Sequence, residues 1–457
     1  MFAGMRRFEF SDGKSNKFWE IEVEGSGFTT RHGRIGTDGR TTTKEYSSAA
    51  LADKRAASAI ASKLGKGYVE VAADSDASTD ALASTSDPET PIAALERRLS
   101  AEPDAFDDWQ VYADGLVAAG DPRGELINIG VNLARGQGDI ERLRSREDAL
   151  LQANAEAWFG KLASDDNWRG CFGWTLKTGF WGRIRVRVDY DHRDTDIPKL
   201  LAYALAHPSG KFLRELDLGL TNVEGDADYE GCIRVLGKHG PLPSLRRLTI
   251  GDFVREESEI SWVGVGDVRR LWPLLTGLEQ LTLKGANIVL GTPKSASLRA
   301  LAINTGGLPG AAGKSLGRAE LPKLEVLEVW FGSEEYDGSC SAAHALGILQ
   351  NPSFAGLRQL ALANADFADD IAEVVARTEL PAKLERLDLS MGTMTDAGAE
   401  RLLARAEAFA RLSVLDLSQN FLSPDMCARV SSALPNARFD EQKHEDDDDS
   451  RYVSVSE

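Results

Sequence analysis

A short basic stretch near the N-terminus combines the side chains that proteins use to contact a phosphate backbone. It reads Arg31-His32-Gly33-Arg34. An imidazole can stack on a base or sugar, and a guanidinium donates hydrogen bonds to phosphate oxygens. Further cations follow and add candidate phosphate contacts. The candidate nucleic-acid-binding residues are Arg31, His32, Gly33, Arg34, Arg40, Lys44 and Lys66.

Two other stretches resemble ligand-binding motifs, but their spacing or position argues against that chemistry. Residues 307–315 nearly spell a phosphate-binding loop, yet the gap from Gly307 to Gly313 is one residue longer than the motif allows. The acidic residues and histidine at 189–194 sit where a predicted strand leaves for a loop, so we interpret them as surface residues. No serine-hydrolase, zinc-protease or dinucleotide-binding motif occurs. We therefore predict no catalytic residue, no cofactor and no metal.

Composition places the chain among globular proteins. Its 457 residues are 42% hydrophobic and 27% charged, which suits several domains with buried cores. No apolar run is long enough to span a membrane, and the start lacks the apolar stretch of a signal peptide. The four cysteines show no metal-binding spacing. We expect a cytoplasmic protein without membrane contact.

Charge is distributed unevenly along the chain. The net charge is −18, which argues against non-specific nucleic-acid binding by the whole molecule. Residues 1–72, however, hold twelve lysines and arginines against nine acidic residues, and the remainder holds 41 against 62. Only the N-terminal part has the balance expected at a phosphate backbone.

The elements that position the basic stretch are a small antiparallel sheet and one helix. Apolar and polar residues alternate as in half-buried strands, with glycine-containing turns between them. An alanine-rich stretch at 49–64 predicts a helix that ends at Gly65. Trp19 is expected in the core between sheet and helix. The predicted strands are 8–10, 17–23, 28–30 and 67–71.

Residues 1–72 resemble a WGR domain. The resemblance rests on Asn16-Lys-Phe-Trp-Glu-Ile-Glu-Val, on Arg31 to Arg40, and on Lys63-Leu-Gly-Lys-Gly-Tyr68. This family occurs in DNA-dependent poly(ADP-ribose) polymerases and in bacterial proteins similar to a molybdate metabolism regulator. In the polymerases its Trp-Gly-Arg tripeptide contacts a DNA end, with the aromatic ring stacking and the arginine reaching phosphate. Gly33 and Arg34 match that tripeptide, while His32 holds the tryptophan position with a smaller stacking surface.

Three roles stay open for this module: nucleic-acid contact, protein contact and a purely structural role. In the structural interpretation, Gly33, Gly36 and Gly39 serve only tight turns. The basic residues would then be a solvated face of the sheet.

The middle of the chain is predicted to connect the N-terminal module to the rest of the chain and to cap one end of a solenoid. Residues 73–90 are small, polar and acidic, as in a flexible linker. Residues 91–165 are helical and resemble a bacterial repeat-companion segment, with polar residues interpreted as helix caps and ion pairs. Residues 166–212 are aromatic and are placed to cap the end of a solenoid. The predicted helices are 91–99, 104–119, one from 121 and 141–163, and the polar residues are Asp114, Asp121, Arg123 and Glu125.

Residues 213–435 repeat one leucine pattern eight times. The clearest copy runs from Leu412 to Leu422, with leucines at its first, fourth and sixth positions and Asn420 at its ninth. The pattern resembles ribonuclease-inhibitor-type leucine-rich repeats. It predicts a curved α/β horseshoe with a parallel sheet on its concave side.

Side chains between the leucines are expected on that concave face, because strand side chains alternate. They are mixed in sign and lean acidic, which suits a protein partner better than nucleic acid. Trp330 is either an interface anchor or packed on a neighbouring loop. The candidate protein-binding residues are Asp217, Glu328, Trp330, Asp388 and Asp416.

Residues 436–457 are predicted to be an acidic disordered tail. The sequence therefore predicts a multidomain α/β protein that acts as a non-enzymatic adaptor, with DNA or RNA at the WGR module and a protein on the repeats. The alternatives are a protein-interaction scaffold without nucleic acid and, more weakly, an enzyme with an unrecognised site.

Overall fold

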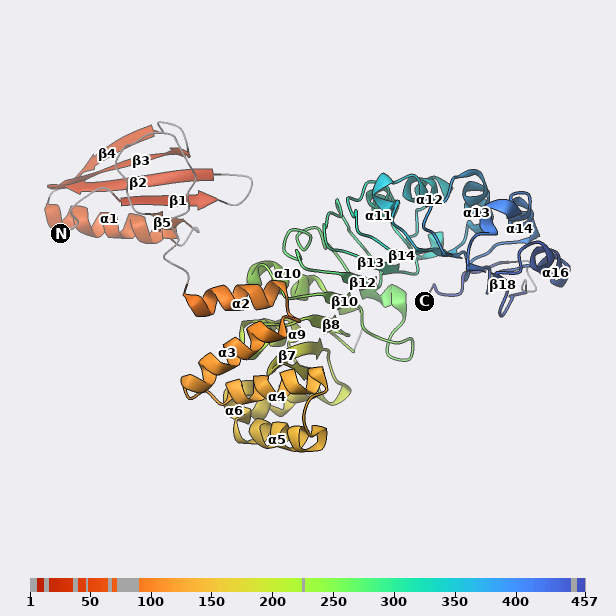
Figure 1. The fold of residues 1–457 in the computed structure, drawn as a ribbon. Coiled ribbons are helices and arrows are strands. Elements are labelled where there is room, and N and C mark those ends of the chain that lie inside the picture. Colours follow the sequence, from red (N-terminus) through yellow and green to blue (C-terminus); the bar gives the residue numbers. More distant parts are fainter. Residues whose placement is uncertain are drawn as a thin grey trace. The chain divides into compact units, whose positions relative to one another are not determined.

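A computed structural model describes residues 6–11, 16–35, 40–46, 48–64, 68–71, 90–223, 227–444 and 450–456. The chain divides into two compact units, Met1–Asp87 and Pro88–Glu457 (Figure 1). Most of the predicted linker, the glycines at 36 and 39, and Lys66 lie outside the described residues.

The N-terminal unit is an antiparallel sheet with the strand order β4-β3-β2-β1-β5, packed on one helix. The helix α1 spans Ala49–Leu64, as the alanine-rich stretch predicts. Phe8, Trp19 and Ile21 are buried against Ala56 and Ile60 of this helix. The predicted antiparallel sheet and helix are thus confirmed, although the strand β4 was not predicted. The strands are β1 (Arg6–Ser11), β2 (Asn16–Glu24), β3 (Gly27–Arg34), β4 (Arg40–Glu45) and β5 (Val69–Val71).

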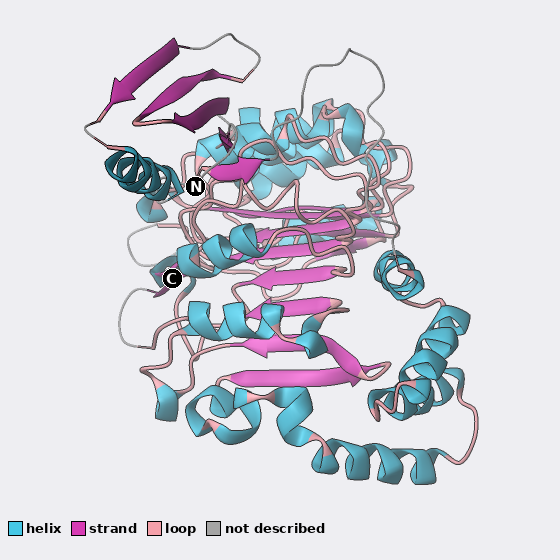
Figure 2. Cartoon of the chain, turned by 90° about the vertical axis from the view of Figure 1, so that its left-hand side faces the viewer, coloured by secondary structure: helices cyan, strands magenta, loops and turns pink. Residues whose placement is uncertain are grey.

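The second unit is organised around one long, mostly parallel sheet (Figure 2). Its strand order is β18-β17-β16-β15-β14-β13-β12-β10-β8-β7-β6, and the antiparallel pair β6–β7 starts it. The strands are β6 (Phe172–Lys177), β7 (Phe180–Val186), β8 (Glu215–Leu218), β10 (Arg247–Ile250), β12 (Gln280–Lys284), β13 (Ala300–Asn304), β14 (Val326–Gly332), β15 (Gln359–Ala365), β16 (Arg386–Asp388), β17 (Val414–Asp416) and β18 (Ala437–Arg438).

Each of the eight predicted leucine strands is present, and neighbouring copies pair in chain order. The register places the fourth-position leucine of one copy beside that of the next, for example Leu360 beside Leu387 and Leu387 beside Leu415. These leucines are buried and form one continuous core with the connecting helices. Each fully buried leucine contributes roughly 1.5–3 kcal/mol of hydrophobic stabilisation, so the ladder holds the sheet together.

Helices follow most of the repeat strands, and their apolar faces cover the leucine side of the sheet. Between β10 and β12, the described residues instead form the short 3-10 turn η3 (Ile260–Trp262) and the strand β11 (Val263–Gly264), which pairs with β9 (Ala227–Asp228). The helices are α9 (Ile197–Ala206), α10 (Glu230–His239), α11 (Gly310–Leu316), α12 (Ala342–Leu349), α13 (Ala368–Arg377), α14 (Asp396–Leu403), α15 (Ala406–Phe409) and α16 (Pro424–Ala433).

The helical segment before the sheet differs from its prediction in one place. The single helix expected at 141–163 is broken into three, because Asn154 turns its side chain back to the carbonyl of Leu150 (2.8 Å) and Gly160 adopts a left-handed φ of 53°. The helices are α2 (Pro91–Ala101), α3 (Phe106–Ala118), α4 (Arg123–Arg135), α5 (Ile140–Ala153), α6 (Ala155–Phe159), α7 (Lys161–Ser164) and α8 (Asp166–Gly170).

This helical segment shares a core with the start of the sheet. The ring of Trp109 on α3 lies 4.9 Å from that of Phe212, which precedes β8, and 5.9 Å from that of Phe180 on β7. Arg123 is buried between the two parts and donates to the carbonyl of Gly179 (3.0 Å) and the hydroxyl of Ser209 (2.9 Å). Residues 91–212 are therefore one packed body with the repeats.

The predicted polar cluster on this segment is partly confirmed. Asp121 accepts a hydrogen bond from the backbone N–H of Arg123 (2.9 Å), as a cap does, and Glu125 pairs with Arg146 (2.6 Å). The Arg123 guanidinium, however, is buried and lies over the Trp158 and Phe180 rings. Burial lowers the pKa of Arg123.

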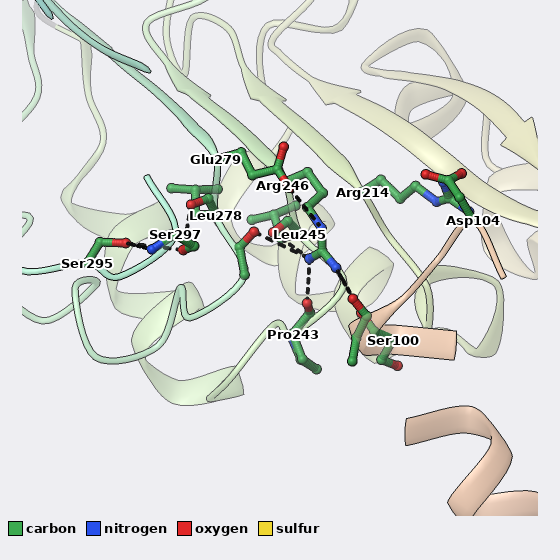
Figure 3. A network of polar contacts seen from close by, with 12 residues as sticks. Ser100, Asp104, Arg214, Pro243, Leu245, Arg246, Leu278, Glu279, Ser295 and Ser297 are labelled. Carbon is green, nitrogen blue, oxygen red and sulfur yellow. Dashed lines mark hydrogen bonds and ion pairs between the residues drawn. The ribbon is translucent and has the colours of Figure 1, made fainter. Parts of the chain in front are cut away.

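Two arginines, each just before a strand, bind the segment that connects α2 and α3 (Figure 3). Arg246, just before β10, donates to the carbonyls of Ala101 (2.7 Å) and Pro243 (2.6 Å). Arg214, just before β8, binds the Asp104 carboxylate (2.7 Å). Because the carbonyls at a helix C-terminus carry partial negative charge, the Arg246 guanidinium stabilises the end of α2.

The last part of the chain departs from the expected disordered tail. Ala437 and Arg438 form β18 and extend the parallel sheet beside β17. Residues 450–456 are packed against the repeat unit, and the Val453 side chain is buried. The acidic run at 445–449 lies outside the described residues.

Candidate nucleic-acid and protein interfaces

The predicted nucleic-acid residues of β3 point to opposite faces of the N-terminal sheet. In the register of β2 and β3, Trp19 lies opposite His32 and Lys17 opposite Arg34, whereas Glu20 lies opposite Arg31. Residues directly opposite each other share a face, and neighbours along a strand do not. His32 and Arg34 therefore lie on the face that carries Trp19, and Arg31 lies on the other.

Arg31 belongs to a charge network around a buried carboxylate. Its guanidinium Nε lies 2.7 Å from the Glu20 carboxylate, which also binds Arg7 at 2.8 Å and is almost fully buried. The hydrogen bonds from Arg31 hold the pKa of Glu20 below its usual range, and those from Arg7 add to this effect. Arg31 is thus engaged in holding the sheet.

Gly33 lies within β3, so the interpretation that it serves a tight turn is wrong. It pairs across the sheet with Phe18, whose ring is buried beneath the Arg7 and Arg31 guanidinium groups at 4.9 and 5.4 Å. A residue without a side chain leaves room for an aromatic ring on the neighbouring strand. Gly33 therefore supports the sheet from the face opposite His32.

The face that carries Trp19 presents the exposed cations. Helix α1 covers Trp19 and Ile21, whereas His32, Arg34 and Lys44 remain exposed. The register places Lys44 opposite Phe28, hence on this same face. Of the seven predicted residues, His32, Arg34 and Lys44 thus share one face, and Arg31 and Gly33 lie on the other. The Arg40 backbone pairs with His32, but the Arg40 side chain and Lys66 lie outside the described part of the chain.

Two cations on this face were missed by the sequence prediction. Lys17 is exposed opposite Arg34, and Lys63 ends α1 with its ammonium 5.4 Å from the Trp19 ring and 4.7 Å from the Tyr68 ring. Both residues are within the segments that resemble the WGR domain, and strand alternation counted from Trp19 would have placed Lys17 on the same face as Trp19. We call the set Lys17, His32, Arg34, Lys44 and Lys63 the basic face.

In the second unit, the side chains between the leucines line the sheet face opposite the connecting helices. Glu328, Trp330 and Asp388 come together around a hollow of about 260 Å³, which Arg386 and Met391 also line. Trp330 is half-buried and packs partly on the core, and its role as an interface anchor stays a prediction. We call this feature the β14–β16 hollow.

Asp217 and Asp416 lie on the same sheet face, but their carboxylates are buried in ion pairs. Asp217 lies 2.6 Å from Arg183 and 3.8 Å from Arg247, and Asp416 lies 2.9 Å from Arg386. A buried charge must be paired to avoid a large desolvation penalty. These two residues therefore stabilise neighbouring strands, which the mixed sequence pattern did not reveal.

The motif-like stretches do not have the geometry of the motifs that they resemble. Helix α11 begins at Gly310, before the lysine and serine of the incomplete phosphate loop, so its N-terminus does not face that loop. Trp181 of the second Trp-Gly-Arg is fully buried and Arg183 pairs with Asp217. Within the described ranges, no group of three or more His, Cys, Asp or Glu side chains is arranged to hold a metal ion.

None of the helices in the described part of the chain has the length and apolar character needed to cross a bilayer. The four cysteines are unpaired. Burial raises the pKa of Cys232 and of Cys340 to about 12, so neither thiol is primed as a nucleophile.

Comparisons with known proteins agree with the geometry of the N-terminal unit. Residues 5–75 match the family model described as WGR domain. The uncharacterized protein YfeS of Escherichia coli K12 is 42% identical over 65 residues, which cover 14% of this chain and 27% of YfeS. Protein YehF of the same organism is 43% identical over 70 residues, covering 15% of this chain and 26% of YehF. The chain thus spans about a quarter of each of these relatives.

One solved structure is similar over the whole length. A crystal structure of a Bacteroides fragilis protein, from the Northeast Structural Genomics Consortium, covers 99% of this chain and is itself covered to 99%, with a TM-score of 0.53 and 21% identity. A likeness at this level of identity concerns the fold alone. The family match, the antiparallel sheet and α1 together establish that residues 5–75 are a WGR domain.

Proposed function

We propose that the protein is a non-enzymatic adaptor whose WGR domain binds nucleic acid and whose parallel-sheet unit binds a protein. The observation that carries the first half is the basic face. It places an exposed imidazole and four cations on one side of a domain that belongs to a family associated with nucleic-acid binding.

The chemistry of the basic face suits a phosphate backbone. Arg34 and Lys17 lie opposite each other at one end of the β2–β3 pair, so their charges are adjacent and can contact neighbouring phosphates. His32 lies next to them on the same face and offers a ring for stacking on a sugar or base. Since this face has one imidazole where family members have an indole, we expect backbone contact to dominate affinity.

The second half of the proposal rests on the β14–β16 hollow. It combines a half-buried tryptophan with an arginine and two carboxylates, Glu328 and Asp388, and aromatic anchors beside charged groups are common at protein interfaces. The repeat unit carries most of the acidic residues of the chain, so the expected partner surface is basic. We further propose that these repeats are of the leucine-rich, ribonuclease-inhibitor type and curve with the hollow on the concave side.

A binding assay with the intact chain tests the nucleic-acid half. Labelled linear duplex, closed circular duplex and single-stranded RNA are titrated with the wild type, Arg34→Ala and Arg55→Ala. Arg55 is exposed on α1, outside the basic face, and its substitution removes the same charge. We expect weaker binding for Arg34→Ala only. Equal effects of the two substitutions would show that binding depends on net charge and not on a specific site. A preference for linear over circular duplex would indicate that the domain binds a DNA end.

The competing proposal is a protein-interaction scaffold in which nucleic acid plays no part. The net charge of −18 favours it, because the acidic repeat unit repels a phosphate backbone. Affinity purification of the intact protein with and without nuclease distinguishes the two. A protein partner whose recovery does not change with nuclease, together with no binding in the titrations above, would support the scaffold.

A further inference from the structure

Residues 450–456 are held in the repeat unit chiefly through their backbone. The side-chain amide of Asn364 donates to the carbonyl of Val455 (2.5 Å), and its oxygen accepts from the N–H of the same residue (2.9 Å). The Met391 carbonyl accepts from the N–H of Ser454 (2.9 Å). Lys443 donates to the carbonyl of Tyr452 (2.6 Å). Backbone contacts of this kind do not depend on the sequence of the bound segment.

The groups that make these contacts are built into the sheet unit. Asn364 is fully buried in β15 with a left-handed φ of 52°, which asparagine tolerates better than most residues. A buried amide that lacked Val455 would lose both partners, at a cost of about 1–3 kcal/mol per unpaired group. Asn364 is therefore formed to receive an extended backbone at this position.

Two apolar contacts add a preference for side chains. Val453 is buried, and Val455 packs on the main core. The ring of Tyr452 stands perpendicular to that of Phe421 at 5.7 Å, with the Lys443 ammonium 5.0 Å from the Phe421 ring. The segment thus offers an aromatic residue followed by valines at alternate positions, as an extended strand presents them.

The binding surface borders the β14–β16 hollow. Met391 is one of the residues that line that hollow, and its carbonyl accepts the hydrogen bond from the N–H of Ser454. Gly306, after β13, lies directly under the end of the segment, because a Cβ at this glycine would meet the carbonyl group of Ser456. The segment itself is preceded in the sequence by the acidic run Glu445 to Asp449.

We propose that Gly306, Asn364, Met391, Phe421 and Lys443 form a binding site for an extended peptide, and that residues 450–456 are its intramolecular occupant. The ligand class is a partner segment with an aromatic residue followed by apolar residues at alternate positions. Such a segment replaces residues 450–456 when it binds. The site goes beyond the proposed adaptor function and does not depend on it, because its probe is the chain's own sequence.

The test uses the chain with residues 445–457 deleted and a labelled peptide of residues 450–456, Ser-Arg-Tyr-Val-Ser-Val-Ser. We expect saturable binding with a Kd below about 1 mM, since tethering supplies an effective concentration of that order. The intact chain should bind the peptide at least about tenfold more weakly, because its site is occupied. A folded truncated chain that does not bind the peptide would overturn the proposal.

Matched variants of the truncated chain locate the site. Asn364→Asp keeps the shape and the acceptor but cannot donate to the peptide carbonyl, so it should weaken peptide binding. Asn287→Asp is the control: this asparagine is exposed after β12 and has a similar φ of 56°. Equal affinities for the two variants would place the peptide elsewhere and contradict the assignment.

Gly306→Ala in the intact chain keeps the test decisive if the truncated chain does not fold. We expect hydrogen exchange at Ser454 and Val455 to rise by about tenfold or more while the rest of the unit is unchanged. Gly347→Ala on α12, where a Cβ meets nothing closer than 3.8 Å, is the control. A general loss of protection would show that residues 450–456 are a permanent part of the fold. If the intact chain forms a dimer and deletion of residues 445–457 abolishes it, the occupant of the site is a second copy of the chain. Either a general loss of protection or such a dimer would overturn the proposal.

Discussion

Arg31 donates to the buried carboxylate of Glu20 across 2.7 Å, on the sheet face opposite Arg34. Two arginines separated by two residues in one strand therefore have different tasks. One neutralises a buried acid within the domain, and the other is exposed on the basic face.

Arg31→Ala should lower the free energy of unfolding of the WGR domain, and it should weaken nucleic-acid binding less than Arg34→Ala does. The substitution removes one of two guanidinium partners of Glu20, and hydrogen bonds to a charged group contribute about 1.5–3 kcal/mol. Urea unfolding of residues 1–87, which form a compact unit, measures the loss. A stability equal to wild type combined with lost binding would place Arg31 at the ligand instead.

The stability of the WGR domain should fall as the pH falls below the usual range of a glutamate. Arg31 holds the pKa of Glu20 below its ordinary value of 4.5, so the folded state binds the proton less readily than the unfolded chain. The stabilisation is therefore present above pH 4.5 and is lost as the pH falls through the folded-state pKa. Glu20→Gln should be less stable at neutral pH but should show a smaller decrease in acid. Parallel pH profiles for the two proteins would contradict this.

Arg123→Ala should destabilise the repeat unit by roughly 2–4 kcal/mol, because it leaves buried acceptors without a donor. The guanidinium binds both Gly179 and Ser209, which a lysine cannot reproduce with one ammonium in the same place. Arg142→Ala, at an exposed position on α5, is the control and should change stability by less than about 0.5 kcal/mol. Denaturant midpoints of the two variants are compared; a similar small change in both would refute a role for Arg123.

Asn420→Ala should also destabilise the repeat unit, by about 1–3 kcal/mol for each buried group left unpaired. The Asn420 amide donates to the carbonyls of Leu389 and Leu417 and accepts from the N–H of Met394, so it connects two neighbouring repeats. Asn436→Ala, a half-buried position that binds Phe409 and Leu412, should cost less. If Asn420→Ala lowers the thermal unfolding temperature less than Asn436→Ala does, burial of the asparagine does not determine the loss of stability.

The sequence predicted the parts of the fold that depend on periodicity. The leucine spacing identified every strand from β8 to β17 in the parallel sheet, because each copy needs the same buried positions. Strand alternation and the alanine-rich stretch identified α1 and four of the five described strands of the WGR sheet, whereas β4 was not predicted. Apolar periodicity did not reveal the break at Asn154 and Gly160, because a helix of the same pattern could have continued through it.

The candidate sites were harder to predict, because they depend on partners distant in sequence. Nothing in the spacing of Asp217 and Asp416 shows that arginines on neighbouring strands pair with them. Residues 450–456 follow an acidic run that predicts disorder, but backbone hydrogen bonds to Asn364 and Met391 hold them, and such bonds leave no pattern in the sequence. Lys17 was overlooked because the basic stretch was considered without its cross-strand neighbours.

The salt dependence of nucleic-acid binding by the intact chain and by Arg34→Ala tests the assignment of the basic face most directly. Each phosphate contact releases counterions, so loss of one contact should reduce the slope of log Kd against log salt concentration by about one unit. We predict this reduction for Arg34→Ala and an unchanged slope for Arg55→Ala. Identical slopes for wild type and Arg34→Ala, or binding that does not respond to salt, would contradict the assignment of the basic face.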